Sequence, residues 1–170
     1  WVEKSYLMDK IIVVSEHAKH GFVETIYEMV NNQTGQNQAV KAKGPIEVVN
    51  YPHRPCEPSD IDLDLKHDFN FLVISQWSPR KNFENTIRWF VEEFIDQEVG
   101  LVVKSSTANN SNNDYQFTRN RIKALLSDPK YADRKCSVHL VHGYMKGSEM
   151  SALYGHPKIK ALVNIAHGEG

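Results

Sequence analysis

NFLVISQWSPRKN, residues 70–82, is the stretch of sequence that decides the fold class. Its first half is short, apolar and β-branched, which is typical of a buried strand. Residues 82–97 follow with apolar side chains three or four positions apart, which predicts an amphipathic helix. A strand that leads through a polar loop into a helix is the unit from which α/β sheets are built.

The same alternation continues along the chain. We predict strands at residues 100–106, 138–142 and 160–166, and helices at residues 115–126 and 146–154. Strands separated by helices form a parallel sheet through right-handed crossovers. The expected fold is therefore α/β, a Rossmann-like parallel sheet with helices on both faces. The buried positions expected in the helix of residues 115–126 are Phe117, Ile122, Leu125 and Leu126.

Residues 1–51 predict a smaller region that precedes this sheet. A strand at residues 10–15 leads into a helix at 16–30, capped by Ser15, with Phe22, Ile26, Met29 and Val30 on one side. Polar residues 31–44 predict a loop, and residues 46–51 a strand. Pro52, Pro55 and Pro58 then favour extended chain, so we interpret residues 52–66 as a linker and 67–170 as a second domain.

Composition excludes several classes of protein. The 170 residues carry 20 Lys and Arg against 21 Asp and Glu, and a net charge of −1 argues against nucleic acid as a partner. Cys56 and Cys136 are isolated, so neither a zinc site nor a disulfide framework is expected. The Gly-x-Gly-x-x-Gly, phosphate-loop and Gly-x-Ser-x-Gly motifs are absent from the sequence.

Ligands of open α/β sheets bind at the carboxyl ends of the strands. There, Arg80 and Lys81 precede a helix and would suit a phosphate, although a solvated basic pair is the alternative. Glu169, between Gly168 and Gly170, could accept hydrogen bonds from hydroxyls of a ligand, or simply belong to a tight turn. Other candidates are interpreted as structural: His139, His142, Trp77 and Trp89.

Four segments together resemble the carboxyl-terminal domain of glycosyltransferase family 4. They are the strand and basic loop of residues 71–82, the Gly-Tyr turn within 138–145, the helix at 148–154 and the Gly-Glu-Gly end of 161–170. Residues 8–16 and 46–52 resemble the last strands of the family's amino-terminal domain. The resemblance implies a GT-B fold, in which two Rossmann-like domains face a cleft and a nucleotide-sugar donor binds mainly to the second.

The resemblance also implies roles for individual residues. Lys81 would neutralise the donor diphosphate, Glu169 would hold sugar hydroxyls, and Tyr144 and Met145 would lie beside the nucleobase. The reaction implied is metal-independent transfer of a sugar, with retention, to a glycan or lipid acceptor. The remaining donor-binding candidates are Ser75, Gln76, Arg80, Lys104, Gly168 and Gly170.

The sequence departs from the family pattern in ways that leave alternatives open. Ser75 and Gln76 stand where the family has Gly-Arg, and Arg80 is a candidate substitute for that arginine. Lys104 either faces phosphate or is simply a charge at the edge of the sheet. The chain starts at Trp1 and ends at Gly170, so we expect a truncated piece of two domains that is inactive by itself. We expect a cytoplasmic location, with peripheral membrane association of the full-length protein and a homodimer left open. The alternative is a non-catalytic or different nucleotide-binding module.

Overall fold

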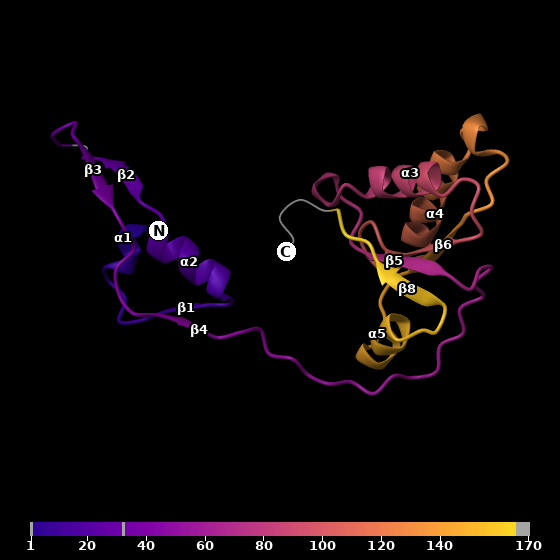
Figure 1. The fold of residues 1–170 in the computed structure, drawn as a ribbon, viewed down its shortest axis with the longest axis horizontal. Coiled ribbons are helices and arrows are strands. Elements are labelled where there is room, and N and C mark those ends of the chain that lie inside the picture. Colours follow the sequence, from indigo (N-terminus) through magenta and orange to yellow (C-terminus); the bar gives the residue numbers. More distant parts are fainter. Residues whose placement is uncertain (1, 32, 166–170) are drawn as a thin grey trace. The chain divides into compact units, whose positions relative to one another are not determined.

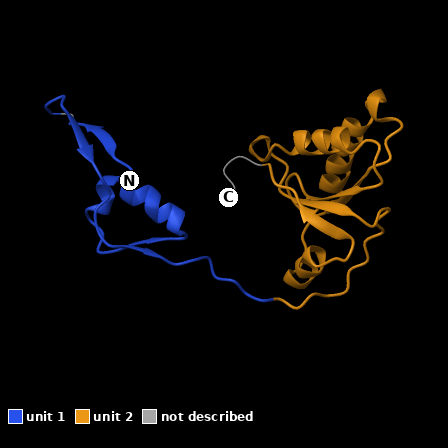
Figure 2. Cartoon of the chain, in the orientation of Figure 1, with its two compact units in different colours: residues 1–55 blue, residues 56–170 orange. Residues whose placement is uncertain are grey.

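The computed structural model describes residues 2–31 and 33–165. The chain divides into two compact units, Trp1–Pro55 and Cys56–Gly170 (Figure 2). The division falls within the stretch at residues 52–66 that the prolines mark as a linker. The resemblance implies that residues 1–51 are the end of the amino-terminal domain, to which the acceptor binds, and that residues 67–170 are part of the donor-binding domain. Both assignments stay predictions.

A parallel four-stranded sheet forms the centre of the second unit (Figure 1). Its strands are β5 (Asn70–Ile74), β6 (Gly100–Ser105), β7 (Ser137–His142) and β8 (Ile159–Leu162). The order across the sheet is β7-β6-β5-β8, and every neighbouring pair is parallel. The predicted α/β class and the parallel sheet are therefore confirmed.

Helices cover both faces of this sheet, as the sequence predicts. Figure 1 shows α3 (Phe83–Glu93) and α4 (Asn112–Leu126) on one side and α5 (Gly147–Tyr154) on the other. The core between the sheet and the first two helices contains the buried residues Val73, Phe83, Ile87, Phe90, Val91, Leu101, Val103, Ile122 and Leu125. On the opposite face, Leu72 and Val102 pack with Leu153 of α5.

The extended segment of residues 56–66, all of which the structure describes, has no helix or strand but belongs to this second core. Leu65 is only 5% exposed, and Ile61 and Leu63 pack against the same cluster as Leu153. The backbone is also tied down, because Lys158 Nζ donates to the Leu65 carbonyl at 3.2 Å. The short helix α5 therefore shares its face of the sheet with extended chain.

The first unit pairs short strands around one helix. β1 (Ile11–Val13) runs parallel to β4 (Ile46–Val48), and α2 (Glu16–Glu24) follows β1, with Ser15 Oγ accepting the Ala18 N–H at 3.1 Å. The predicted cap at Ser15 is thus confirmed. A further short helix, α1 (Val2–Ser5), precedes β1, and β2 (Tyr27–Val30) forms an antiparallel pair with β3 (Asn37–Val40).

Two predicted elements of the first unit are wrong. The helix expected over residues 16–30 stops at Glu24, and residues 27–30 form β2 instead. The loop expected over residues 31–44 contains β3. The hairpin forms because Gly35 takes a positive φ of 68°, and its N–H bonds the Asn31 carbonyl at 2.8 Å. This turn brings the two short strands together.

The buried positions of two helices also differ from expectation. Phe117, predicted to be buried, is 55% exposed, and α4 buries Asp114 and Thr118 together with Ile122 and Leu125. Trp89, interpreted as a packing residue, is 53% exposed, whereas Trp77 is buried as expected. The polar pair at the start of α4 is part of the candidate site described below.

We predict that Leu65→Ala lowers the free energy of unfolding by about 3 kcal/mol, because it leaves a cavity in the second core. Leu162→Ala is the matched control: Leu162 is 62% exposed, so its truncation should cost less than about 0.5 kcal/mol. Urea unfolding followed by circular dichroism measures both. Equal small losses would show that the 56–66 segment does not contribute to the core.

Candidate functional site

The carboxyl ends of β5, β6 and β7 bring three loops to one edge of the sheet. They follow β5 at residues 75–82, β6 at 106–111 and β7 at 143–146. The first two loops run side by side, because Ser75 N–H donates to the Lys104 carbonyl at 3.1 Å and Trp77 N–H to the Ser106 carbonyl at 3.0 Å. This edge is where α/β proteins bind ligands, and it carries all the predicted site residues that the structure describes.

Gln76 holds the two loops together. Its Nε2 donates to the Thr107 carbonyl at 3.2 Å. In the sequence resemblance to glycosyltransferase family 4, Gln76 corresponds to an arginine of the family. The amide thus has a structural partner across the loops, and it brings no charge to the site.

Arg80 and Lys81 lie in a 3-10 turn, Pro79–Lys81, immediately before α3. Asn82 then takes a left-handed conformation, φ 51°, which turns the chain into the helix. Lys81 is half-buried and Arg80 is exposed. Burial lowers the pKa of the Lys81 ammonium, and the positive charge of Arg80 lowers it further. An anion bound beside the pair would oppose both effects, since it would stabilise the charged ammonium.

Lys104 joins the end of β6 to the loop after β7. Its Nζ donates to the Gly143 carbonyl, and burial lowers its pKa. Lys104 lies near the carboxyl end of β6, which is an interior strand, so its charge is not on an outer strand of the sheet. In this conformation Lys104 supports the neighbouring turn.

The other predicted residues differ in accessibility. Tyr144 is 76% exposed, next to the Gly143 carbonyl that Lys104 holds. Met145 packs against the core cluster that contains Leu72. The structure thus offers the ring of Tyr144, and much less of Met145, to a ligand. The sequence also points to Gly168, Glu169 and Gly170, which lie outside the described residues.

Sequence reasoning missed Asp114, a buried carboxylate in the first turn of α4. It accepts the N–H of Thr107 at 3.1 Å and of Ala108 at 2.9 Å, and its Oδ2 lies 2.8 Å from Nε2 of His142. His142 is thus a structural group, as predicted. The available signal was Ser111, three residues before an acidic residue, a pattern typical of a helix start.

Burial by itself would raise the pKa of the Asp114 carboxyl. The hydrogen bonds from His142 and from the backbone of Ala108, Thr107 and Asn109 outweigh it, so the pKa is lowered. The ionised carboxylate therefore fixes the loop after β6 to α4. This loop is firmly held on the side that faces the helix.

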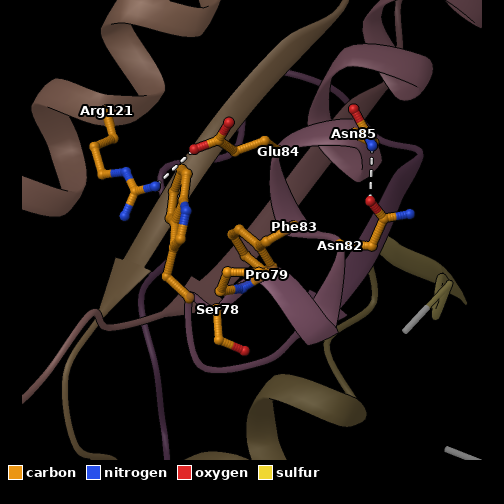
Figure 3. A pocket seen from close by; sticks show the side chains of 8 residues that line it. Ser78, Pro79, Asn82, Phe83, Glu84, Asn85 and Arg121 are labelled. Atoms are coloured by element: carbon orange, nitrogen blue, oxygen red, sulfur yellow. Dashed lines mark hydrogen bonds and ion pairs between the residues drawn. The ribbon is translucent and has the colours of Figure 1, made fainter. Parts of the chain in front are cut away.

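A cavity of about 290 Å³ adjoins the basic turn, between the loop after β5, the first turn of α3 and α4 (Figure 3). The Arg121 guanidinium lies 4.5 Å from the centre of the Trp77 ring, and its Nη2 is 2.6 Å from Glu84 Oε1. Asn85 Nδ2 donates to Asn82 Oδ1 at 2.7 Å. These polar groups therefore bond to one another within the wall of the cavity.

Comparisons of the chain with protein-family models, curated proteins and solved structures give no match. Within residues 2–31 and 33–165, no group of three or more His, Cys, Asp or Glu side chains could hold a metal ion. Over the same residues, no helix has the length and apolar character needed to cross a membrane. The candidate site therefore depends on its own geometry and on the sequence resemblance.

We predict that Asp114→Asn lowers the free energy of unfolding by about 2 kcal/mol at pH 7, because an amide cannot accept all the bonds of the carboxylate. The pKa of Asp114 in the folded chain lies below its ordinary value. The ionised carboxylate therefore stabilises the fold fully at pH values above the pKa of the unfolded chain, and this contribution is lost as the pH falls through the pKa of the folded chain. The difference from wild type should therefore shrink below about pH 4.

Urea unfolding at several pH values measures this difference. Asp133→Asn removes a carboxylate from an exposed position of the same unit and is the control. A difference between wild type and Asp114→Asn that stays constant down to pH 3 would contradict the role given to the ionised carboxylate.

Proposed function

We propose that the chain contains the donor-binding part of a retaining GT-B glycosyltransferase, and that the carboxyl edge of its parallel sheet binds a nucleotide-sugar. The observation that carries the proposal is the position of Arg80 and Lys81, in the turn between the end of β5 and the start of α3. Two cations beside a helix N-terminus favour the charge of a diphosphate.

Each part of the donor has a candidate partner in this proposal. Lys81 stabilises the charge that develops on the diphosphate when the sugar leaves, which supplies the stabilisation without a metal ion. Tyr144, whose side chain is exposed, is the candidate partner of the nucleobase. The sequence resemblance assigns the sugar hydroxyls to Glu169, and it assigns a glycan or lipid acceptor to the facing domain.

A second candidate function is a nucleotide-binding module without transfer activity. The observation that favours it is the bond between Gln76 Nε2 and the Thr107 carbonyl. The family has an arginine at the position of Gln76, and here that residue joins two loops and carries no charge. Both candidates bind a nucleoside diphosphate. Release of nucleoside diphosphate from a nucleotide-sugar in the presence of an acceptor, measured on a protein that joins this chain to the facing acceptor domain, would separate them. Only the transferase breaks the bond between the sugar and the diphosphate.

We predict that the chain binds one or more of uridine, guanosine and adenosine diphosphate saturably, and that Lys81→Ala weakens this affinity about tenfold. A charge-assisted hydrogen bond of about 1.5 kcal/mol or more corresponds to that factor. Isothermal titration calorimetry measures the affinities. The matched control is Lys135→Ala, an exposed lysine next to the amino end of β7 and therefore at the opposite edge of the sheet.

The control variant should bind as the wild type does. Two results would contradict the proposal: no saturable binding of any of the three nucleotides up to millimolar concentration, or an equal loss in both variants. The second result would indicate a general effect of removing positive charge.

A further inference from the structure

The turn after β7 combines an exposed side chain with a firmly held backbone. Gly143 is buried and has a φ of 86°, and the next residue, Tyr144, exposes 76% of its surface. The Gly143 carbonyl accepts from Lys104 Nζ, and the Tyr144 N–H donates to Asn110 Oδ1 at 2.9 Å. Side chains from β6 and from the loop after it thus hold both polar groups of the peptide between Gly143 and Tyr144.

Asn110 and Gly143 also fit each other sterically. A Cβ atom at position 143 would lie 1.8 Å from Asn110 Oδ1, so any other residue would displace this side chain. The positive φ excludes most other residues as well. Glycine at 143 is thus required both by the turn and by the approach of Asn110.

The loop that carries Asn110 is itself anchored. Asn109 Oδ1 accepts the Ser111 N–H at 2.8 Å, and the Asp114 carboxylate holds the N–H groups of Thr107 and Ala108. Asn110 is exposed, so its bond to Tyr144 contributes little to the core. A series of hydrogen bonds therefore runs from Asp114 of α4 through this loop to the turn at Gly143. These bonds fix the backbone that carries the exposed Tyr144 ring.

An exposed aromatic ring on a fixed backbone suits stacking on a planar ligand. Stacking of a base on an aromatic side chain contributes about 1–3 kcal/mol, and less ordering entropy opposes binding when the backbone is already held. Tyr144 stands at the same edge of the sheet as Lys81. A planar base joined to a diphosphate has parts suited to both residues.

We infer that Asn110 is a positioning residue, which through its bond to the Tyr144 N–H orients the Tyr144 ring to stack on the base of a nucleoside diphosphate. This inference rests on the proposed function, because it assumes that the diphosphate lies at Lys81. It assigns a separate role to each residue. Lys81 binds the phosphates, and Asn110 affects only the affinity for the base.

The test compares two ligands in the same chain by titration calorimetry. One is the best-bound of uridine, guanosine and adenosine diphosphate, and the other is inorganic pyrophosphate. Asn110→Ala should reduce the ratio of their affinities about tenfold, with pyrophosphate binding unchanged, because only the base is affected. Asn110→Asp keeps the acceptor oxygen, so this ratio should stay within about twofold of wild type, even if the added charge weakens both ligands.

The same measurements on Lys81→Ala complete the design, because that variant should lose affinity for both ligands alike. An unchanged ratio in Asn110→Ala, an equal loss of both ligands, or a ratio in Asn110→Asp as low as in Asn110→Ala would each overturn the inference while the proposed function stood. Failure of the wild-type chain to bind any of the three nucleotides would overturn the proposed function and this inference with it.

Discussion

Leu101, Val102 and Val103 of the central strand β6 are completely buried, and alternate side chains of a strand point to opposite faces of the sheet. Such a strand needs apolar cover on both faces. Helices α3 and α4 supply it on one face, and α5 with the 56–66 segment on the other. A sheet buried in this way is typically parallel, and β6 is parallel to both of its neighbours. The carboxyl ends of these strands therefore lie at one edge of the sheet, which is where the candidate site is found.

The sequence predicts the second unit well and the first unit only in part. The strands around β6 are short, apolar and separated by long amphipathic helices, so periodicity identifies them. In residues 16–30, Phe22, Ile26, Met29 and Val30 fit a helix face, but the turn at Gly35 returns β3 to pair with β2. The periodicity of residues 16–30 cannot predict this pairing, because the partner strand lies outside that segment. β2 ends at Val30, and β3 begins only at Asn37.

The candidate site likewise has a part that the sequence predicts and a part that it does not. The sequence places Arg80 and Lys81 correctly between a strand and a helix, because that position depends on local order alone. The bonds from Gln76 to Thr107, from Lys104 to Gly143 and from Asn110 to Tyr144 join segments that are far apart in sequence. Only the folded chain shows that these polar side chains support neighbouring loops.

The central claim is that the carboxyl edge of the sheet binds a nucleoside diphosphate, and amide chemical shifts of the ¹⁵N-labelled chain test it most directly. Titration with uridine, guanosine and adenosine diphosphate should shift, for at least one of them, amides in residues 75–82 and 143–146 in a saturable way. Amides at the amino edge, near Lys135, should stay in place. Absence of shifts with all three nucleotides, or shifts concentrated at the amino edge, would contradict the account.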